Sequence, residues 1–178
     1  MSRPVQSLPQ ADFTEQFNIP VDLADWLGKK TLAIAVTEVT HAVNERQLQP
    51  VFSFNERRLF QPWTLLSLVT YSYAVGIYGS DQIAHRLMHD ETFHALFSHE
   101  CWDADLIRRF RNQNRNLIQQ CLEKVCLLAW ARKFGRVQAQ PGATAPVRIH
   151  SLFKIQMICD VRTRIHCAEQ ADLLAAAA

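Results

Sequence analysis

The sequence predicts a mainly α-helical protein, a helical bundle that contains a helix-turn-helix-like unit, on three observations. Residues 103–134 have helical periodicity without an internal proline. Residues 62–78 are apolar nearly all round, as in a central buried helix, and they begin with a proline, which a first helical position tolerates. Between them lie two short segments with helical spacing, 80–90 and 90–98. Two short helices followed by a longer helix with polar side chains are typical of such a unit.

The 103–134 helix has two contrasting faces. At about 100° per residue, one narrow sector holds the apolar residues Leu106, Phe110, Leu117, Cys121 and Leu128. The opposite sector, called here the arginine stripe, holds Arg108, Arg111, Asn112, Arg115 and Gln119, with Arg109 at its side. No acidic residue occurs between Leu106 and Glu123. Guanidinium and amide groups suit phosphates and base edges, although an ordinary solvated face has the same composition.

Composition bounds the class of protein. The chain has 178 residues, 48% hydrophobic and 20% charged, which fits one folded globular domain. A net charge of +2 neither requires nor excludes nucleic acid. No apolar run is long enough to span a bilayer, and the N-terminus lacks the apolar core of a secretory signal. Five cysteines without a CxxC pair predict reduced thiols, so we expect a cytoplasmic protein with no membrane partner.

The N-terminal third is predicted to join the helical body after a flexible arm. Prolines and polar residues in 1–20 indicate the arm, and 21–27 suits a short helix anchored by Trp26. Residues 31–47 are predicted to be helical, because their apolar residues recur at helical spacing. Those residues are Leu32, Ala35, Val36, Val39 and Val43. Further along, Ser80 and Asp90 are suitable N-caps for the two short helices.

The C-terminal part is ambiguous in its secondary structure. Residues 136–147 have the composition of a linker. From 153 to 167, apolar and polar residues alternate, which predicts a short β segment, a strand or hairpin; helix is the competing prediction because no turn divides the run. The final residues favour helix. We expect 148–178 to form a tail held less stably than the body, because a lone strand has no neighbour to pair with.

An ordered set of motifs points to a family. An apolar helix ends at Gly79 and Ser80, and Arg86, Asp90 and then Phe93 with Leu96 follow; later comes the Arg-Phe-Arg element 109–111. With these motifs, 50–134, roughly half the chain, resembles the N-terminal helical domain of insertion-sequence transposases of the DDE superfamily. The resemblance implies that 21–135 is a DNA-binding domain for the terminal inverted repeats of a mobile element.

The chain also departs from that family. His99, Glu100 and Cys101 replace an apolar or Gly/Pro-rich connection. The catalytic domain of such transposases carries three carboxylates that hold two metal ions, and the few acidic residues after Phe134 do not supply them. Asp160 has a place comparable to the first of these carboxylates, but it lacks the Gly-Thr that follows in the family. We therefore interpret 148–178 as a remnant of the start of that domain and expect no enzyme activity.

The predicted function is DNA binding without a catalytic domain, and the alternative is a helical protein-protein interaction module that uses the arginine-rich face. The predicted partner is double-stranded DNA, with a homodimer as an open option. No cofactor or metal is expected, since His85, His89, His94, His99 and Cys101 lack a second tight ligand pair for zinc. The predicted DNA contacts are Arg86, Arg108, Arg109, Arg111, Asn112, Arg115 and Gln119.

Overall fold

The described backbone is almost wholly helical. The computed structural model describes residues 18–49, 51, 62–97, 102–134 and 146–177, and no strand occurs within those ranges. The mainly α-helical prediction is therefore confirmed. In chain order the helices are α2 Ala24–Leu27, α3 Lys29–His41, the 3-10 helix η1 Glu45–Gln47, α4 Pro62–Ala74, α5 Ser80–His89, α6 Glu91–Phe97, α7 Ala104–Gln113, α8 Arg115–Phe134 and α9 Pro146–Ala176.

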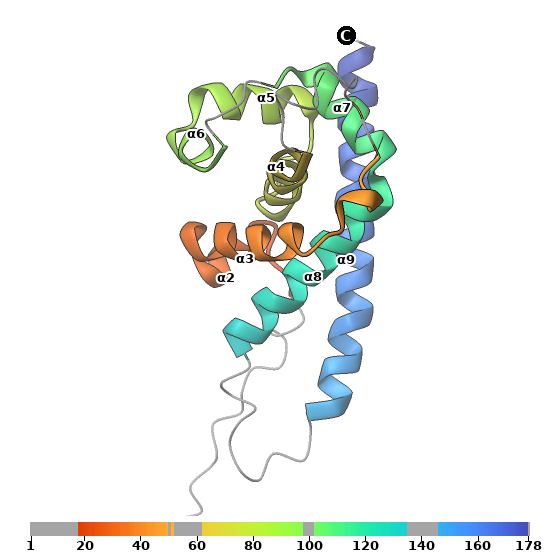
Figure 1. The fold of residues 1–178 in the computed structure, drawn as a ribbon. Coiled ribbons are helices and arrows are strands. Elements are labelled where there is room, and N and C mark those ends of the chain that lie inside the picture. The colour runs from red at the N-terminus through yellow and green to blue at the C-terminus, as the bar shows by residue number, and fades with distance from the viewer. Residues whose placement is uncertain (1–17, 50, 52–61, 98–101, 135–145, 178) are drawn as a thin grey trace, which may run out of the picture.

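Helix α4 lies at the centre of the bundle (Figure 1). Helices α3 and α8 pack against it, α5 and α6 lie above it in this view, and α9 runs along α7 and α8 for most of the height of the molecule (Figure 1). The rings of Phe93 and Phe97 of α6 pack against Tyr71 of α4. Every residue of α4 from Leu65 to Ala74 is buried, as its uniformly apolar sequence predicts. The helix ends earlier than Tyr78, because Gly76 takes a φ of 78° and a Cβ there would lie 2.6 Å from Val21.

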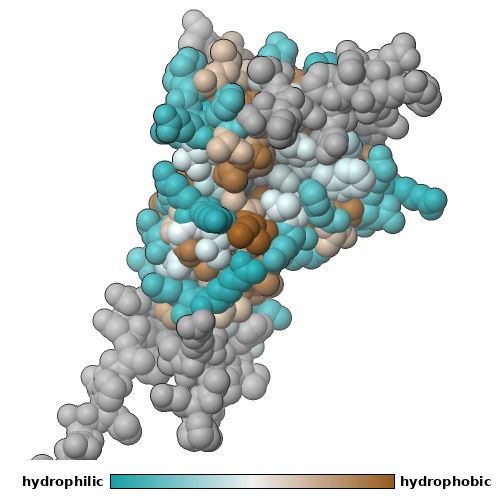
Figure 2. Space-filling model, turned by 60° about the vertical axis from the view of Figure 1, so that its left-hand side comes forward, coloured by the Kyte–Doolittle hydropathy of each residue, from teal (hydrophilic) through white to brown (hydrophobic). Residues whose placement is uncertain are grey.

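The side chains predicted to anchor the N-terminal helices do so. All five apolar positions predicted within 31–47 are buried, although α3 ends at His41 and Val43 lies beyond it. The rings of Trp26 of α2 and Phe134 pack edge to face with centroids 5.4 Å apart. Several described helices carry exposed apolar side chains on their outer faces, among them Ile34 of α3, Met88 of α5 and Ile155 of α9. Figure 2 shows one such face, where apolar residues alternate with hydrophilic ones.

Carboxylate caps start two of the helices. The Asp90 Oδ1 accepts from the Thr92 backbone N–H at 2.9 Å, and the Asp103 Oδ1 accepts from that of Leu106 at 2.7 Å. Both caps satisfy backbone donors that a helix start leaves unpaired. The prediction of Ser80 as an N-cap is wrong, since α5 already begins at Ser80 and Gly79 is its cap.

The predicted single helix 103–134 is two helices. Asn114 separates α7 from α8 with φ −110° and ψ 19°. Its side chain forms two hydrogen bonds with the main chain of Gln49: the Oδ1 accepts from the N–H at 2.8 Å and the Nδ2 donates to the carbonyl at 3.2 Å. An asparagine that binds backbone outside its own helix favours a local break. This partner lies 65 residues earlier, so helical periodicity did not reveal it.

The predicted β segment is also wrong, and the competing helix prediction holds. Residues 146–176 form one helix, α9, which begins within the predicted linker. Its buried apolar residues Phe153, Met157, Val161 and Ile165 recur every four residues. That spacing satisfies both a period of two and, over a few turns, a period of 3.6, which explains the ambiguity. Phe153 stacks on Trp130 of α8 with ring centroids 4.8 Å apart.

Two buried charged residues of α9 bind the junction between α4 and α5. The Arg164 guanidinium, in a residue 2% exposed, donates to the carbonyls of Val21 and Tyr73 at 2.7 and 2.9 Å and pairs with Asp160 at 2.6 Å. Asp172 accepts from the backbone N–H and hydroxyl of Ser80 at 2.9 and 3.0 Å. The cation thus meets the negative end of α4, and the carboxylate meets the positive end of α5.

These contacts remove the reason for expecting a loosely held tail. That expectation depended on an unpaired strand, whereas α9 contributes buried side chains to the core formed by 18–134. Asp160, interpreted from the sequence as the vestige of a catalytic residue, lies on a helix and partners Arg164.

Changing Arg164 to Met tests this role. The variant leaves buried carbonyls without donors and Asp160 without its cation, so we expect a loss of about 3 kcal/mol in the free energy of unfolding. Arg162→Met on the exposed side of the same helix is the control and should change stability by less than about 0.5 kcal/mol. Urea unfolding of both variants gives the comparison, and equal stability would contradict the role assigned to Arg164.

The Asp90 cap predicts a pH dependence. Burial by itself would raise the pKa of Asp90. Hydrogen bonds from the Thr92 N–H, the Arg86 side chain and the Phe93 N–H lower it by more, so the pKa of Asp90 is below its ordinary value. A lowered folded pKa gives stability that is present above about pH 4 and is lost as the pH falls through the folded value.

The loss of stability on removing the Asp90 cap should depend on pH in the same way. Asp90→Ala should cost about 1 kcal/mol at neutral pH, whereas Asp90→Asn keeps a capping oxygen and should lose less. The difference between the parent and Asp90→Asn should shrink as the pH falls below about 4 and vanish once the pH is below the folded pKa of Asp90, as thermal unfolding would show. A difference that is constant with pH would show that the charge of Asp90 contributes nothing.

Candidate nucleic-acid interface

The arginine stripe is not one exposed face, and the prediction is wrong for Arg111. This residue is only 5% exposed. Its guanidinium donates to the carbonyls of Tyr78 and Ala168 and pairs with Asp172 at 2.9 Å. It also lies 5.6 Å from the centre of the Tyr73 ring. Arg111 therefore joins α7 to α9, and its side chain does not face solvent.

The two arginines on either side of Arg111 also have carboxylate partners. Arg108 pairs with Asp105 one turn earlier, and its guanidinium lies within 3.7 Å of Asp81 and 3.6 Å of Asp172. The Arg115 side chain is 55% exposed and pairs with Glu169 of α9 at 2.8 Å. Two carboxylates of α9, those of Asp172 and Glu169, thus lie near Arg108 and Arg115, which the sequence of α7 and α8 alone does not show.

The other predicted contacts have different surroundings. Gln119 is half-buried and donates to Glu123 at 2.9 Å. Arg86 pairs with Asp90 on α5 at 3.0 Å, and its side chain is 54% exposed. Arg109 and Asn112 are exposed, and Arg109 makes no ion pair with another residue that the structure describes.

The outward face of α7 and α8 is displaced by one residue from the predicted stripe. Its exposed side chains recur at the helical spacing i, i+3, i+4, i+7 and i+11 and carry no acidic group. They form a surface that we call the amide strip, made of Arg109, Asn112, Gln113, Asn116 and Gln120. Because α9 covers the side of Arg108 and Arg111, the solvent-facing sector begins at Arg109.

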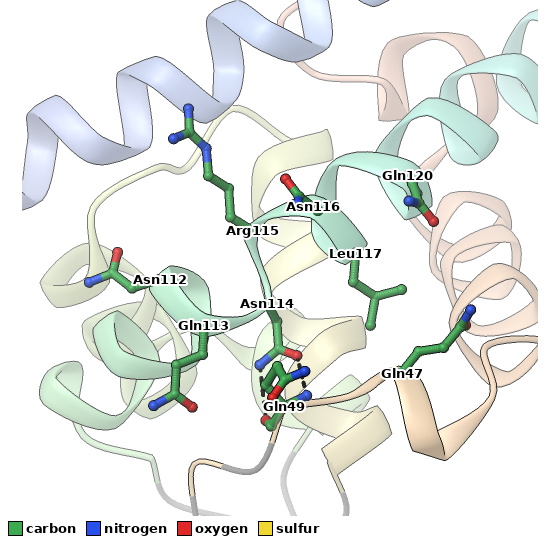
Figure 3. Close-up of a pocket in the computed structure, with 9 residues that line it drawn as sticks. All are labelled: Gln47, Gln49, Asn112, Gln113, Asn114, Arg115, Asn116, Leu117 and Gln120. Carbon is green, nitrogen blue, oxygen red and sulfur yellow. Dashed lines mark hydrogen bonds between the residues drawn. The ribbon is translucent and has the colours of Figure 1, made fainter.

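A polar groove of about 400 Å³ adjoins the amide strip. Figure 3 shows Gln47 and Gln49 on one side and the junction of α7 and α8 on the other, with Arg115 extending toward α9. The bonds from Asn114 to Gln49 hold the two sides together (Figure 3). The groove is lined by Gln47, Gln49, Asn112, Gln113, Asn114, Arg115, Asn116, Leu117 and Gln120.

The chemistry of this groove suits binding. Amides donate and accept hydrogen bonds but exchange no protons near neutral pH, and Arg115 is the one charged residue among those lining it. The thiols of α8 lie elsewhere in the core. Burial raises the pKa of Cys121 to about 11 and that of Cys126 to about 12, so neither is a nucleophile at neutral pH.

Two of the histidines that were not expected to bind zinc, His85 and His89, lie close together. The rings of His85 and His89 stack at 4.2 Å, and the Nδ1 of His89 contacts the His85 carbonyl at 2.9 Å. No cluster of three metal-ligating side chains occurs in the part of the chain that the structure describes. His99 and Cys101 lie outside the described residues.

Sequence reasoning missed most of the groove. Gln113, Asn116 and Gln120 follow Arg109 at regular helical spacing, so this signal was available. Choosing between that sector and the arginine stripe required knowledge of the α9 partners. Gln49 joins the site through its bonds to Asn114, a contact that no local pattern indicates.

Comparisons of the chain with protein-family models, with curated proteins and with solved structures gave no match. The resemblance to transposase domains therefore stays a prediction. None of the helices within the described ranges is long and apolar enough to cross a membrane.

Asn114 should control the geometry of the groove. Asn114→Asp keeps the acceptor for the Gln49 N–H but places a carboxylate against the Gln49 carbonyl, so we expect destabilisation of about 1–3 kcal/mol. Exposed Asn116→Asp makes the same chemical change in the first turn of α8 and should alter stability by less than about 0.5 kcal/mol. Chemical denaturation measures both, and an equal effect would show that the Gln49 bonds contribute nothing.

Proposed function

We propose that this protein binds double-stranded DNA through the amide strip and the adjoining groove. The observation that carries the proposal is an exposed, acid-free row of one arginine and four amides on consecutive turns of α7 and α8. Arginine contacts phosphates, and asparagine and glutamine pair bidentately with adenine edges. The side chains come from the end of α7 and the start of α8, and the major groove, about 12 Å wide, admits an α-helix.

One arginine of the neighbouring segment fits the same orientation, although the exposed Glu45 beside it carries the opposite charge. Arg46 is exposed on η1 next to Gln47, which lines the groove. Arg109 and Arg46 thus lie on elements that border the polar groove. In this arrangement the arginines contact the DNA backbone and the amides between them contact base edges.

The proposed target is the terminal inverted repeat of a mobile element, on the basis of the resemblance alone. Part of the motif on which the resemblance rests belongs to the core in this protein, because Phe110 and Arg111 of the 109–111 element are buried. Asp90 caps α6. We propose DNA recognition without catalysis by this chain, in a cytoplasm, whose reducing conditions suit the free thiols.

The alternative partner is an acidic protein, and one observation favours it. The exposed Arg115 already binds a carboxylate, that of Glu169. DNA and an acidic protein differ in salt dependence, because DNA releases condensed counterions when its phosphates are neutralised.

The experiment is a binding titration on duplex DNA at several salt concentrations. Arg109→Ala should weaken binding to all sequences alike and reduce the salt slope by about one, as expected of a phosphate contact. Asn112→Ala should weaken the preferred sequence by about 1–3 kcal/mol and relax specificity there. Arg132→Ala at the far end of α8 removes the same charge and should leave affinity nearly unchanged.

Two results would contradict the proposal. The first is that the parent protein shows no DNA binding even at low salt. The second is that Arg109→Ala and Arg132→Ala weaken binding equally. Binding to acidic polypeptide that exceeds binding to DNA at matched charge would favour the interaction module.

A further inference from the structure

Glu169 of α9 lies at the edge of the proposed DNA-binding surface. Its carboxylate is 2.8 Å from the guanidinium of Arg115, a residue that also lines the polar groove. Its other oxygen lies 3.8 Å from the Nδ1 of His166 on the same helix. Asp172, one turn further along α9, is bonded to Ser80, so this part of the helix is fixed relative to the bundle. Glu169 is therefore held in place opposite Arg115.

The ion pair of Arg115 differs from that of Arg111. The Arg111 and Asp172 side chains are 5% and 10% exposed, so separating them would leave buried charges unpaired. The Arg115 and Glu169 side chains are 55% and 36% exposed, and water can solvate either one after separation. Exposed pairs of this kind contribute about 0–1 kcal/mol, so another anion can replace the carboxylate.

We propose that Glu169 is an intramolecular competitor for a DNA phosphate at Arg115, so that α9 limits the affinity of the protein for DNA. The inference rests on the proposed function. A carboxylate and a phosphate are interchangeable acceptors for a guanidinium, since both take paired N–H hydrogen bonds. A phosphate at Arg115 would lie near Asn112, which lines one small pocket together with Arg115 and Glu169.

Two physical effects of Glu169 act in the same direction. While the carboxylate occupies Arg115, that arginine neutralises no phosphate and releases no counterion. The negative charge also repels an approaching polyanion. Both effects disappear in Glu169→Gln, which keeps the shape of the side chain. The fold should tolerate this change because the pair is largely exposed.

A double-mutant cycle on DNA binding tests the proposal. Glu169→Gln should bind duplex DNA about 3–10-fold more tightly at low salt and raise the salt slope by about one, because Arg115 becomes free to bind phosphate. Arg115→Ala in the parent should change affinity by less than about 2-fold, since that arginine is already occupied. Adding Arg115→Ala to Glu169→Gln should remove most of the gain, so the two changes are strongly non-additive.

Glu38→Gln is the matched control. Glu38 pairs with Arg132 at 3.0 Å on the exposed side of α8, and its loss raises the net charge by the same amount. We expect its DNA affinity to stay near that of the parent. Thermal unfolding of all variants should show that each is folded at the assay temperature.

The outcomes separate this inference from the proposed function. If the parent binds DNA but Glu169→Gln binds no better, or if Glu38→Gln gains as much, Glu169 is not a specific competitor. If the changes at positions 115 and 169 are additive, the gain does not pass through Arg115, and the inference is wrong. If neither the parent nor any variant binds DNA, the proposed function itself fails.

Discussion

The fold depends on the pairing of two buried charges with two helix ends. The turn between α4 and α5 leaves carbonyls at one helix end and N–H groups at the next helix start inside the molecule, where water does not satisfy them. Arg164 donates to the carbonyls, and Asp172 accepts from the N–H and hydroxyl of Ser80. Both come from α9, two turns apart on one helix. Each buried charge is thus compensated, which burial of an ionised group requires.

The placement of α9 then decides which side chains remain available for function. Asp172 also binds Arg111, and Glu169 binds Arg115, so two guanidinium groups of the α7 and α8 region face α9. The solvent-facing sector shifts to the amide strip. The break at Asn114 has a related effect, because its bonds to Gln49 bring a second chain segment beside the strip and create the groove. Structural interactions therefore define the candidate interface more than the local arginine pattern does.

Local patterns predicted local structure well. The five buried apolar positions within 31–47, the burial of α4 and the cap Asp90 were predicted from periodicity and from the unpaired donors of a helix start, and all are present. The errors arose where a distant partner decides. The apolar residues of α9 recur every four residues, a spacing that did not distinguish strand from helix. In the structure this segment is a helix that packs against Trp130 and the rest of the core. Arg111 looked solvent-exposed because its acceptors at Ala168 and Asp172 lie some 60 residues later. DNA binding rests on side-chain chemistry and resemblance and awaits the titrations.

Hydrogen exchange tests the central claim about α9 most directly. Amide exchange is measured by mass spectrometry on the dilute protein, and peptides covering 157–172 are compared with peptides covering 117–130 of α8. If α9 belongs to the same cooperative core, both sets should exchange slowly and with similar opening free energies, while the exposed end near 173–176 exchanges faster. Rapid exchange throughout 157–172, with α8 still protected, would show that α9 is not part of the core and that its charges do not hold the α4–α5 junction.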